Sequence, residues 1–161
     1  MNADVEALRR ELEEAFAGRA HLYREMLDAL EAELGADRAE TLMREVLEKR
    51  GAAVSGQLFK GCAATPQAVG ARFLSVSPDG GRMYPHSVAD DGAALHVKVA
   101  RCPLKDAWVG AGLAPARVAQ LCAIAGAFDK GLFEAAGVAF ANETWSQKRG
   151  GGCCWISLSP A

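Results

Sequence analysis

The sequence predicts an α+β fold, in which an N-terminal helical hairpin precedes a four- to five-stranded, mostly antiparallel sheet with a helix from the C-terminal half packed on it. Three observations indicate this class. Residues 1–53 show helical periodicity, residues 70–159 contain short apolar segments separated by glycine-rich turns, and Pro115 opens a further apolar helix. The chain of 161 residues suits a single domain, in which residues 1–53 form the hairpin and residues 70–159 the sheet-and-helix part.

The hairpin is predicted from the spacing of its apolar residues. Between residues 5 and 34 they recur at steps of three, four and seven, which places them along one side of a helix. Gly35 supplies a stop signal, and Asp37 with Glu40 three positions later has the pattern of a capping box that starts a second helix ending near Gly51. Its charged faces are typical of solvated surface, so no chemistry is predicted in the hairpin.

The sheet is predicted from alternating apolar residues bounded by turn residues. Pro85 interrupts the second of these segments, which favours an edge position for that strand. The short connections favour antiparallel pairing. The expected strands cover residues 71–77, 82–89, 95–102, 138–146 and 153–159.

Composition excludes several classes of protein. A net charge of −2 argues against a nucleic-acid binder, and no apolar run approaches the roughly 20 residues that cross a bilayer. The first residues lack the pattern of a secretory signal, so a cytoplasmic protein is expected, with a small molecule as its partner and a homo-oligomer left open. The five cysteines are odd in number and irregular in spacing, and we expect reduced thiols without a structural disulfide.

Candidate chemistry lies on cysteines of the C-terminal half. Cys102 ends a predicted strand immediately before Pro103, where a rigid scaffold can present a reactive group. Cys122 and Asp129 are seven residues apart on one helix face, about 10 Å from each other. In the last strand, alternation places Cys154 on the apolar face. We therefore expect Cys122, Asp129 and Cys154 to converge on one cavity between helix and sheet.

Alternatives remain open for these residues. Cys153 is expected on the outer face or in the glycine turn, and Asp129 could lie at the edge of the apolar stripe and bond a neighbour. His86 and His96 could each serve as a base for a thiol, although His96 also fits a plain polar position in an alternating strand. Zinc is the less favoured alternative to a metal-free and cofactor-free site, because the spacing of Cys102, Cys122 and Cys154 is not that of structural zinc.

Three segments together resemble a known family. They are Arg101-Cys102-Pro103-Leu104-Lys105-Asp106-Ala107-Trp108, then Leu121-Cys122 with Asp129 downstream, then a glycine turn followed by Cys153-Cys154-Trp155-Ile156-Ser157-Leu158. Their order resembles the L-2-amino-thiazoline-4-carboxylic acid hydrolase family, and the N-terminal hairpin is also similar. The resemblance points to Cys102, Cys122, Asp129 and Cys154. Gly150-Gly151-Gly152 and Trp155 depart from the acidic turn and the small polar residue typical of the family.

The resemblance implies a bacterial-type, cysteine-dependent hydrolase. Its substrate would be a small cyclic amidine-like compound with a C=N/C–S carbon, such as 2-amino-thiazoline-4-carboxylate, opened by water with cleavage of a C–N bond. Arg72, Arg101 or Arg149 could bind the substrate carboxylate. Residues expected to bind substrate are His86, His96, Arg101 and Trp155. The alternative is a non-enzymatic domain that binds a small molecule, a metal or a thiophilic ligand through the same cysteines.

Overall fold

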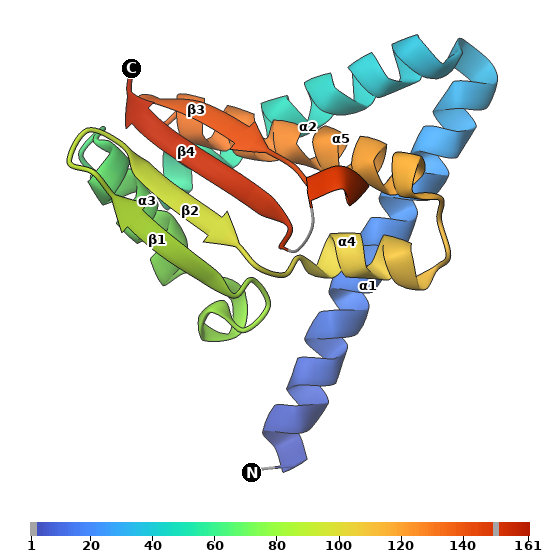
Figure 1. Cartoon of the computed structure of the whole chain (residues 1–161), viewed down its shortest axis with the longest axis horizontal. Helices are drawn as coiled ribbons and strands as arrows, with labels where there is room; N and C mark the ends of the chain where they lie inside the picture. Colours follow the sequence, from blue (N-terminus) through green and yellow to red (C-terminus); the bar gives the residue numbers. More distant parts are fainter. Residues whose placement is uncertain (1–2, 150–151) are drawn as a thin grey trace.

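The computed structural model describes residues 3–149 and 152–161 and has the predicted α+β class (Figure 1). Its helices are α1 (Ala3–Leu34), α2 (Ala36–Leu58), α3 (Pro66–Ser75), α4 (Pro103–Gly110) and α5 (Pro115–Glu134). Its strands are β1 (His86–Asp90), β2 (Leu95–Val99), β3 (Val138–Glu143) and β4 (Cys154–Pro160). Short 3-10 turns cover Pro78–Gly81 and Gln147–Arg149. No helix within the described residues has the length and apolar character needed to cross a membrane.

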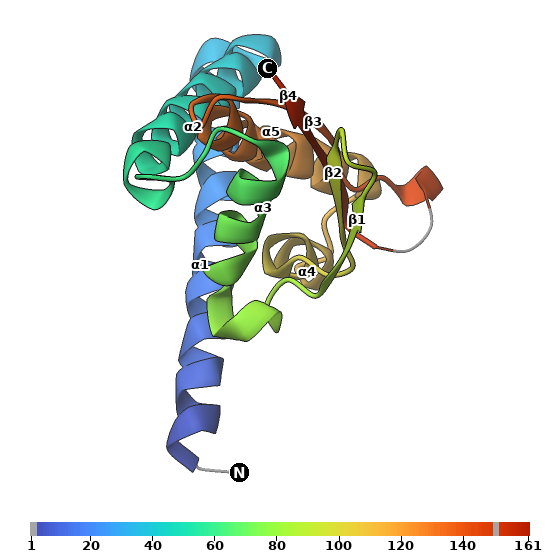
Figure 2. The same cartoon turned by 90° about the vertical axis from the view of Figure 1, so that its left-hand side faces the viewer.

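The strands form one open antiparallel sheet in the order β1-β2-β4-β3. Val97 of β2 lies opposite Val88 and Ile156, and Val97 and Ile156 are buried in the core, whereas Val88 on the edge strand is exposed. All five α-helices lie on the same side of the sheet, and the other side, called the open face below, carries no α-helix of the described residues (Figure 2). Strand β1 directly follows Pro85 and occupies an edge, as the proline predicted.

The α1–α2 hairpin is confirmed, and α5 packs closely along α2. Glycine permits this approach, because a Cβ at Gly131 would lie 1.9 Å from the Glu48 carbonyl oxygen. Helix α4 packs on α1 through Trp108, which is fully buried and donates its indole N–H to the Ala20 carbonyl at 2.7 Å. These contacts attach both C-terminal-half helices to the hairpin.

Two predicted local structures are wrong. Residues 71–77 are not a strand, because Thr65 caps the N-terminus of α3 by accepting from the Ala68 N–H, and Pro66 opens the helix. The capping box at Asp37 does not form either. Helix α2 begins directly after Gly35 without a side-chain cap and continues past Gly51 to Leu58.

The core consists of two apolar clusters, one among the helices and one between helices and sheet. Cys102, Phe128 and Trp145 pack against both clusters. The loop from β2 to α4 therefore carries Cys102 into the junction of the two clusters, where the candidate site lies.

Candidate active site at the junction of helices and sheet

Cys102 caps the N-terminus of α4, a location that follows from the residues around it. Its backbone is extended, with φ −133° and ψ 121°, and Pro103 then fixes the first helical position. The pKa of the Cys102 thiol is lowered, chiefly by a hydrogen bond from Cys153, and burial opposes this effect. Backbone N–H groups of Lys105 and Leu104 lower the pKa further. A thiolate at a helix N-terminus is the form of cysteine that acts as a nucleophile.

Cys153 and Cys154 extend this arrangement into a row of thiols. Their sulfur atoms are 3.1 Å apart, and Cys153 is buried, with its backbone N–H bonded to the Val99 carbonyl at 2.8 Å. Hydrogen bonds with Cys102 and then Cys154 raise the pKa of Cys153 well above its usual range. Strand β4 begins at Cys154, so Cys153 lies in the preceding bend and points to neither sheet face as a strand residue would. Of the two positions expected for Cys153, the turn is therefore the one that it occupies, although its side chain is buried there.

Cys122 lies on α5 and is buried beside the same thiols. Burial is the main cause that raises its pKa, and the charges of Cys102 and Cys154 raise it further, while Lys105 opposes them. The structure thus brings Cys102, Cys122 and Cys154 within electrostatic reach of one another.

Asp129 lies about two turns further along α5. Its side chain is half-buried by surface area, yet protein surrounds the carboxyl group closely enough that burial raises its pKa to about 7, partly offset by the charge of Arg19. In the part of the chain that the structure describes, no hydrogen-bond donor reaches this carboxyl group. Asp129 also acts on the Cys102 thiol, whose pKa its charge raises.

Helix α1 and the segment before β1 add three residues that sequence reasoning missed. The Arg19 guanidinium lies 4.6 Å above the Phe16 ring, and its charge lowers the pKa of Tyr84 against the stronger effect of burial. Burial raises the pKa of Tyr84, and the charge of Cys102 raises it further. Burial also raises the pKa of Tyr23. The charge of Arg19 lowers this pKa in part, and the charge of Asp129 raises it. The hairpin therefore contributes polar groups to the site, contrary to the sequence prediction.

The structure does not bring His96 and Trp155 to the thiols. Both lie on the open face of the sheet, with ring centroids 6.0 Å apart, whereas Cys154 faces the helices. The His96 ring bonds the Ser157 hydroxyl at 2.9 Å and is 3.7 Å from an Asp91 carboxylate oxygen. These contacts explain His96 as a polar residue of the open face.

The other predicted binding residues have partners of their own. His86 shares a face and a row with Cys154, but two strand spacings, about 10 Å, separate them, and its ring bonds the Tyr84 carbonyl at 2.8 Å. Arg101 pairs with Asp106 at 2.8 Å. Arg72 donates to the Leu58 carbonyl, and the Arg149 side chain lies outside the described residues.

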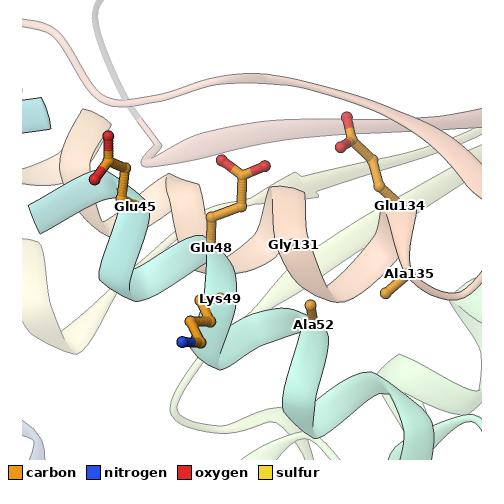
Figure 3. A pocket seen from close by; sticks show the side chains of 7 residues that line it. All are labelled: Glu45, Glu48, Lys49, Ala52, Gly131, Glu134 and Ala135. Atoms are coloured by element: carbon orange, nitrogen blue, oxygen red, sulfur yellow. The ribbon is translucent and has the colours of Figure 1, made fainter. Parts of the chain in front are cut away.

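The groove between α2 and α5 does not offer comparable chemistry. A shallow groove between α2 and α5 is lined mainly by small residues and by Lys49 and three glutamates, whose carboxylates project to one side of the helices in Figure 3 (Glu45, Glu48 and Glu134). It contains no nucleophile. Among residues 3–149 and 152–161, no three or more His, Cys, Asp or Glu side chains are grouped so that they could hold a metal ion.

A comparison with family models matches residues 10–157 to L-2-amino-thiazoline-4-carboxylic acid hydrolase. The chain belongs to this family. The matched range contains all four thiols of the cluster, Asp129 and the newly found Arg19. The family name denotes a hydrolase of an aminothiazoline carboxylate. Among curated proteins, the comparison found no match.

The fold is also similar to that of trafficking protein particle complex subunit 3 from Naegleria fowleri, solved covalently bound to palmitic acid. The two chains share 13% identity and superpose with a TM-score of 0.57, over 90% of this chain and 94% of the other. Trp155, which we interpreted from the sequence as a departure from the family pattern, is exposed on the open face of the sheet. The departure at Gly150 and Gly151 lies outside the described residues.

Proposed function

We propose that this protein is a cysteine-dependent hydrolase that opens a small cyclic amidine-like substrate, such as 2-amino-thiazoline-4-carboxylate or a related compound, with Cys102 as nucleophile. The observation that carries the proposal is the position of Cys102 at the N-terminus of α4, where its pKa is lowered. The neighbouring thiols Cys122 and Cys153 have raised pKa values, so they are poor nucleophiles near neutral pH. Cys62 packs against the apolar cluster between helices and sheet and is not among the causes of the pKa shifts of Cys102, Cys122 and Cys153.

The proposed reaction uses Asp129 as the proton-handling group. The Cys102 thiolate adds to the C=N carbon, and the π electron pair moves to the nitrogen, which takes the proton shared with the Asp129 carboxyl group. The lone pair of the exocyclic nitrogen then expels the ring nitrogen, so the C–N ring bond breaks and a proton passes from the exocyclic nitrogen to the leaving amine. Water adds to the carbon, gives one proton to the remaining C=N nitrogen and one to the Asp129 carboxylate, and the bond to the Cys102 sulfur breaks, which restores the thiolate. A carboxyl group with a pKa of about 7 can both give and accept this proton near neutral pH.

Arg19 is the cation best placed to bind a substrate carboxylate. Its charge acts on both Asp129 and Tyr84, and within the described residues no carboxylate forms an ion pair with it. Arg101, by contrast, is paired with Asp106. A zwitterionic amidine could therefore place its cationic end at Asp129 and its carboxylate at Arg19.

A second candidate is a binding domain that holds a ligand on Cys102 without turnover. It is favoured by the likeness of this fold to a trafficking-complex subunit that carries covalently bound palmitic acid. In that case Cys102 would form a stable thioester or remain a ligand-binding thiol, and no ring-opened product would be released.

The two candidates are separated by assaying purified protein with 2-amino-thiazoline-4-carboxylate and following ring opening by mass spectrometry. Cys102→Ser should abolish turnover, Cys122→Ser and Cys154→Ser should retain it, and Cys62→Ser is the matched control outside the cluster. Asp129→Asn should lower kcat about 100-fold or more, the scale usual for a general acid–base group.

Full activity in Cys102→Ser would refute the assignment of the nucleophile. Wild-type protein that turns over no cyclic amidine, but accumulates one acyl group per chain on Cys102 when given an acyl thioester, would favour the binding domain.

A further inference from the structure

One edge of the sheet is exposed along nearly its whole length. Strand β1 pairs with β2 on one side, and its other side forms a free edge of the sheet (Figure 1). All residues of β1 after His86 are exposed, and Val88 keeps 47% of its surface accessible. The opposite edge, β3, is better covered, because Val138 is buried and most of the strand is partly buried. Edge strands present N–H and C=O groups that can pair with another chain.

The hydrogen bonds of β1 determine which of its residues face this edge. The Ala100 N–H donates to the Pro85 carbonyl at 2.7 Å, which makes these residues a bonded pair that continues the register of β1 and β2. Bonded and non-bonded pairs alternate along an antiparallel ladder. Every second residue after Pro85 therefore bonds β2, and the residues between direct their N–H and C=O groups to the free edge. These outward residues are His86, Val88 and Asp90.

The three outward residues are arranged symmetrically about Val88. In an antiparallel pair of two copies with Val88 opposite Val88, each outward residue would both donate and accept a backbone hydrogen bond. The same register places His86 of each copy opposite Asp90 of the other, so the strand is complementary to itself.

The side chains at the two ends of this pair also match. His86 and Asp90 have opposite charges when the imidazole is protonated, which is a favourable cross-strand pair. The His86 Nδ1–H donates to the Tyr84 carbonyl, so Nε2 is the atom that would meet the other copy. Asp90 accepts from Gln67 and Gly92 through Oδ1, and Oδ2 would accept from the imidazole.

We propose that β1 is the interface of a homodimer, in which two copies pair antiparallel about Val88 and join their four-stranded sheets into one. Edges that stay unpaired commonly carry a lysine, an internal proline or a bulge, and residues 86–90 contain none of these. The contact would be one strand wide and smaller than a standard stable interface, so we expect a dimer that dissociates on dilution. The inference is independent of the proposed hydrolysis.

The test measures sedimentation velocity of reduced full-length protein at concentrations up to the millimolar range, and we expect a monomer–dimer equilibrium. Val88→Pro should abolish the dimer, because proline removes an outward N–H without removing a bond of the β1–β2 ladder. Val88→Thr is the matched control, since it keeps the N–H and the branched shape, and it should still dimerise. The amide hydrogens of His86, Val88 and Asp90 should exchange more slowly as the dimer forms.

A second pair of variants tests the register even if Val88→Pro fails to fold. His86→Asp places a carboxylate opposite Asp90 of the other copy at both ends and should raise the dissociation constant about 10-fold or more. His86→Asn has the same size without the charge and should weaken the dimer less.

Four outcomes would overturn the inference. They are a monomer at every concentration, a dimer that folded Val88→Pro leaves intact, equal dimerisation of His86→Asp and wild type, and slower amide exchange confined to segments other than residues 86–90.

Discussion

Replacing Asp129 by asparagine should stabilise the protein, and the gain should grow with pH. Burial raises the pKa of Asp129 to about 7 in the folded protein, whereas an unfolded chain restores a value near 3.8. Between these values the folded state binds more protons than the unfolded state, so the free energy of unfolding falls as the pH rises. Each pH unit is worth about 1.4 kcal/mol, so ionising Asp129 costs the folded state roughly 4 kcal/mol at pH 8 and under 2 kcal/mol at pH 5.

Asparagine has nearly the shape of aspartate and no charge to bury. We expect the gap in unfolding free energy between Asp129→Asn and wild type to widen by roughly 2–3 kcal/mol from pH 5 to pH 8, measured by urea unfolding. Asp37→Asn is the matched control, because it removes the same charge from the exposed first turn of α2, and it should change stability by about 0.5 kcal/mol or less at either pH. A gap that stays constant with pH would refute the burial argument for Asp129.

The remaining predictions concern packing and thiols. Gly131→Ala should destabilise the protein by about 2 kcal/mol or more in chemical unfolding, because its Cβ would meet the Glu48 carbonyl oxygen. Gly56→Ala is the control, because a Cβ at this helical glycine would lie in open space, and it should be neutral or stabilising. Equal effects of the two substitutions would contradict the close approach of α2 and α5. Trp108→Phe should cost about 1–3 kcal/mol by losing the buried bond to Ala20, and a neutral effect would count against that bond. Alkylation of freshly purified protein without reductant should modify five thiols, and a chain lighter by two hydrogens would oppose this.

The long helices were predictable because apolar residues recur at helical spacing over one continuous segment of the chain. The region of α1 and α2 and the opening of α5 at Pro115 follow directly from such patterns. Helix α3 was predicted as a strand, since its run of Val, Phe and Leu residues is short enough to suit either structure. The N-terminal cap at Thr65 and the packing of Gly70 against Leu95 both favour the helix. The cap is local, whereas the packing against Leu95 depends on residues distant in sequence.

The site could be anticipated only where it depends on local geometry. The inward orientation of Cys154 follows from strand alternation, and the shared helix of Cys122 and Asp129 follows from their spacing. Arg19 could not be found in this way, because α1 meets the site only through tertiary packing of α4 and α5. Cys153 lies in the turn before β4, one of the two positions expected for it, but its burial there depends on tertiary packing and could not be predicted from the sequence.

The electrostatics of the site favour a cationic substrate. The charge of Asp129 raises the pKa of Cys102, so an ionised Asp129 carboxylate opposes formation of the Cys102 thiolate. An amidinium placed between the two groups would offset this repulsion and allow both to be charged at once. The same cation would be the electrophile that the thiolate attacks, so substrate binding and activation of the carbon would depend on one charge. A neutral thiazoline would reach the same state by taking the proton of Asp129, which is why a pKa of about 7 suits this residue.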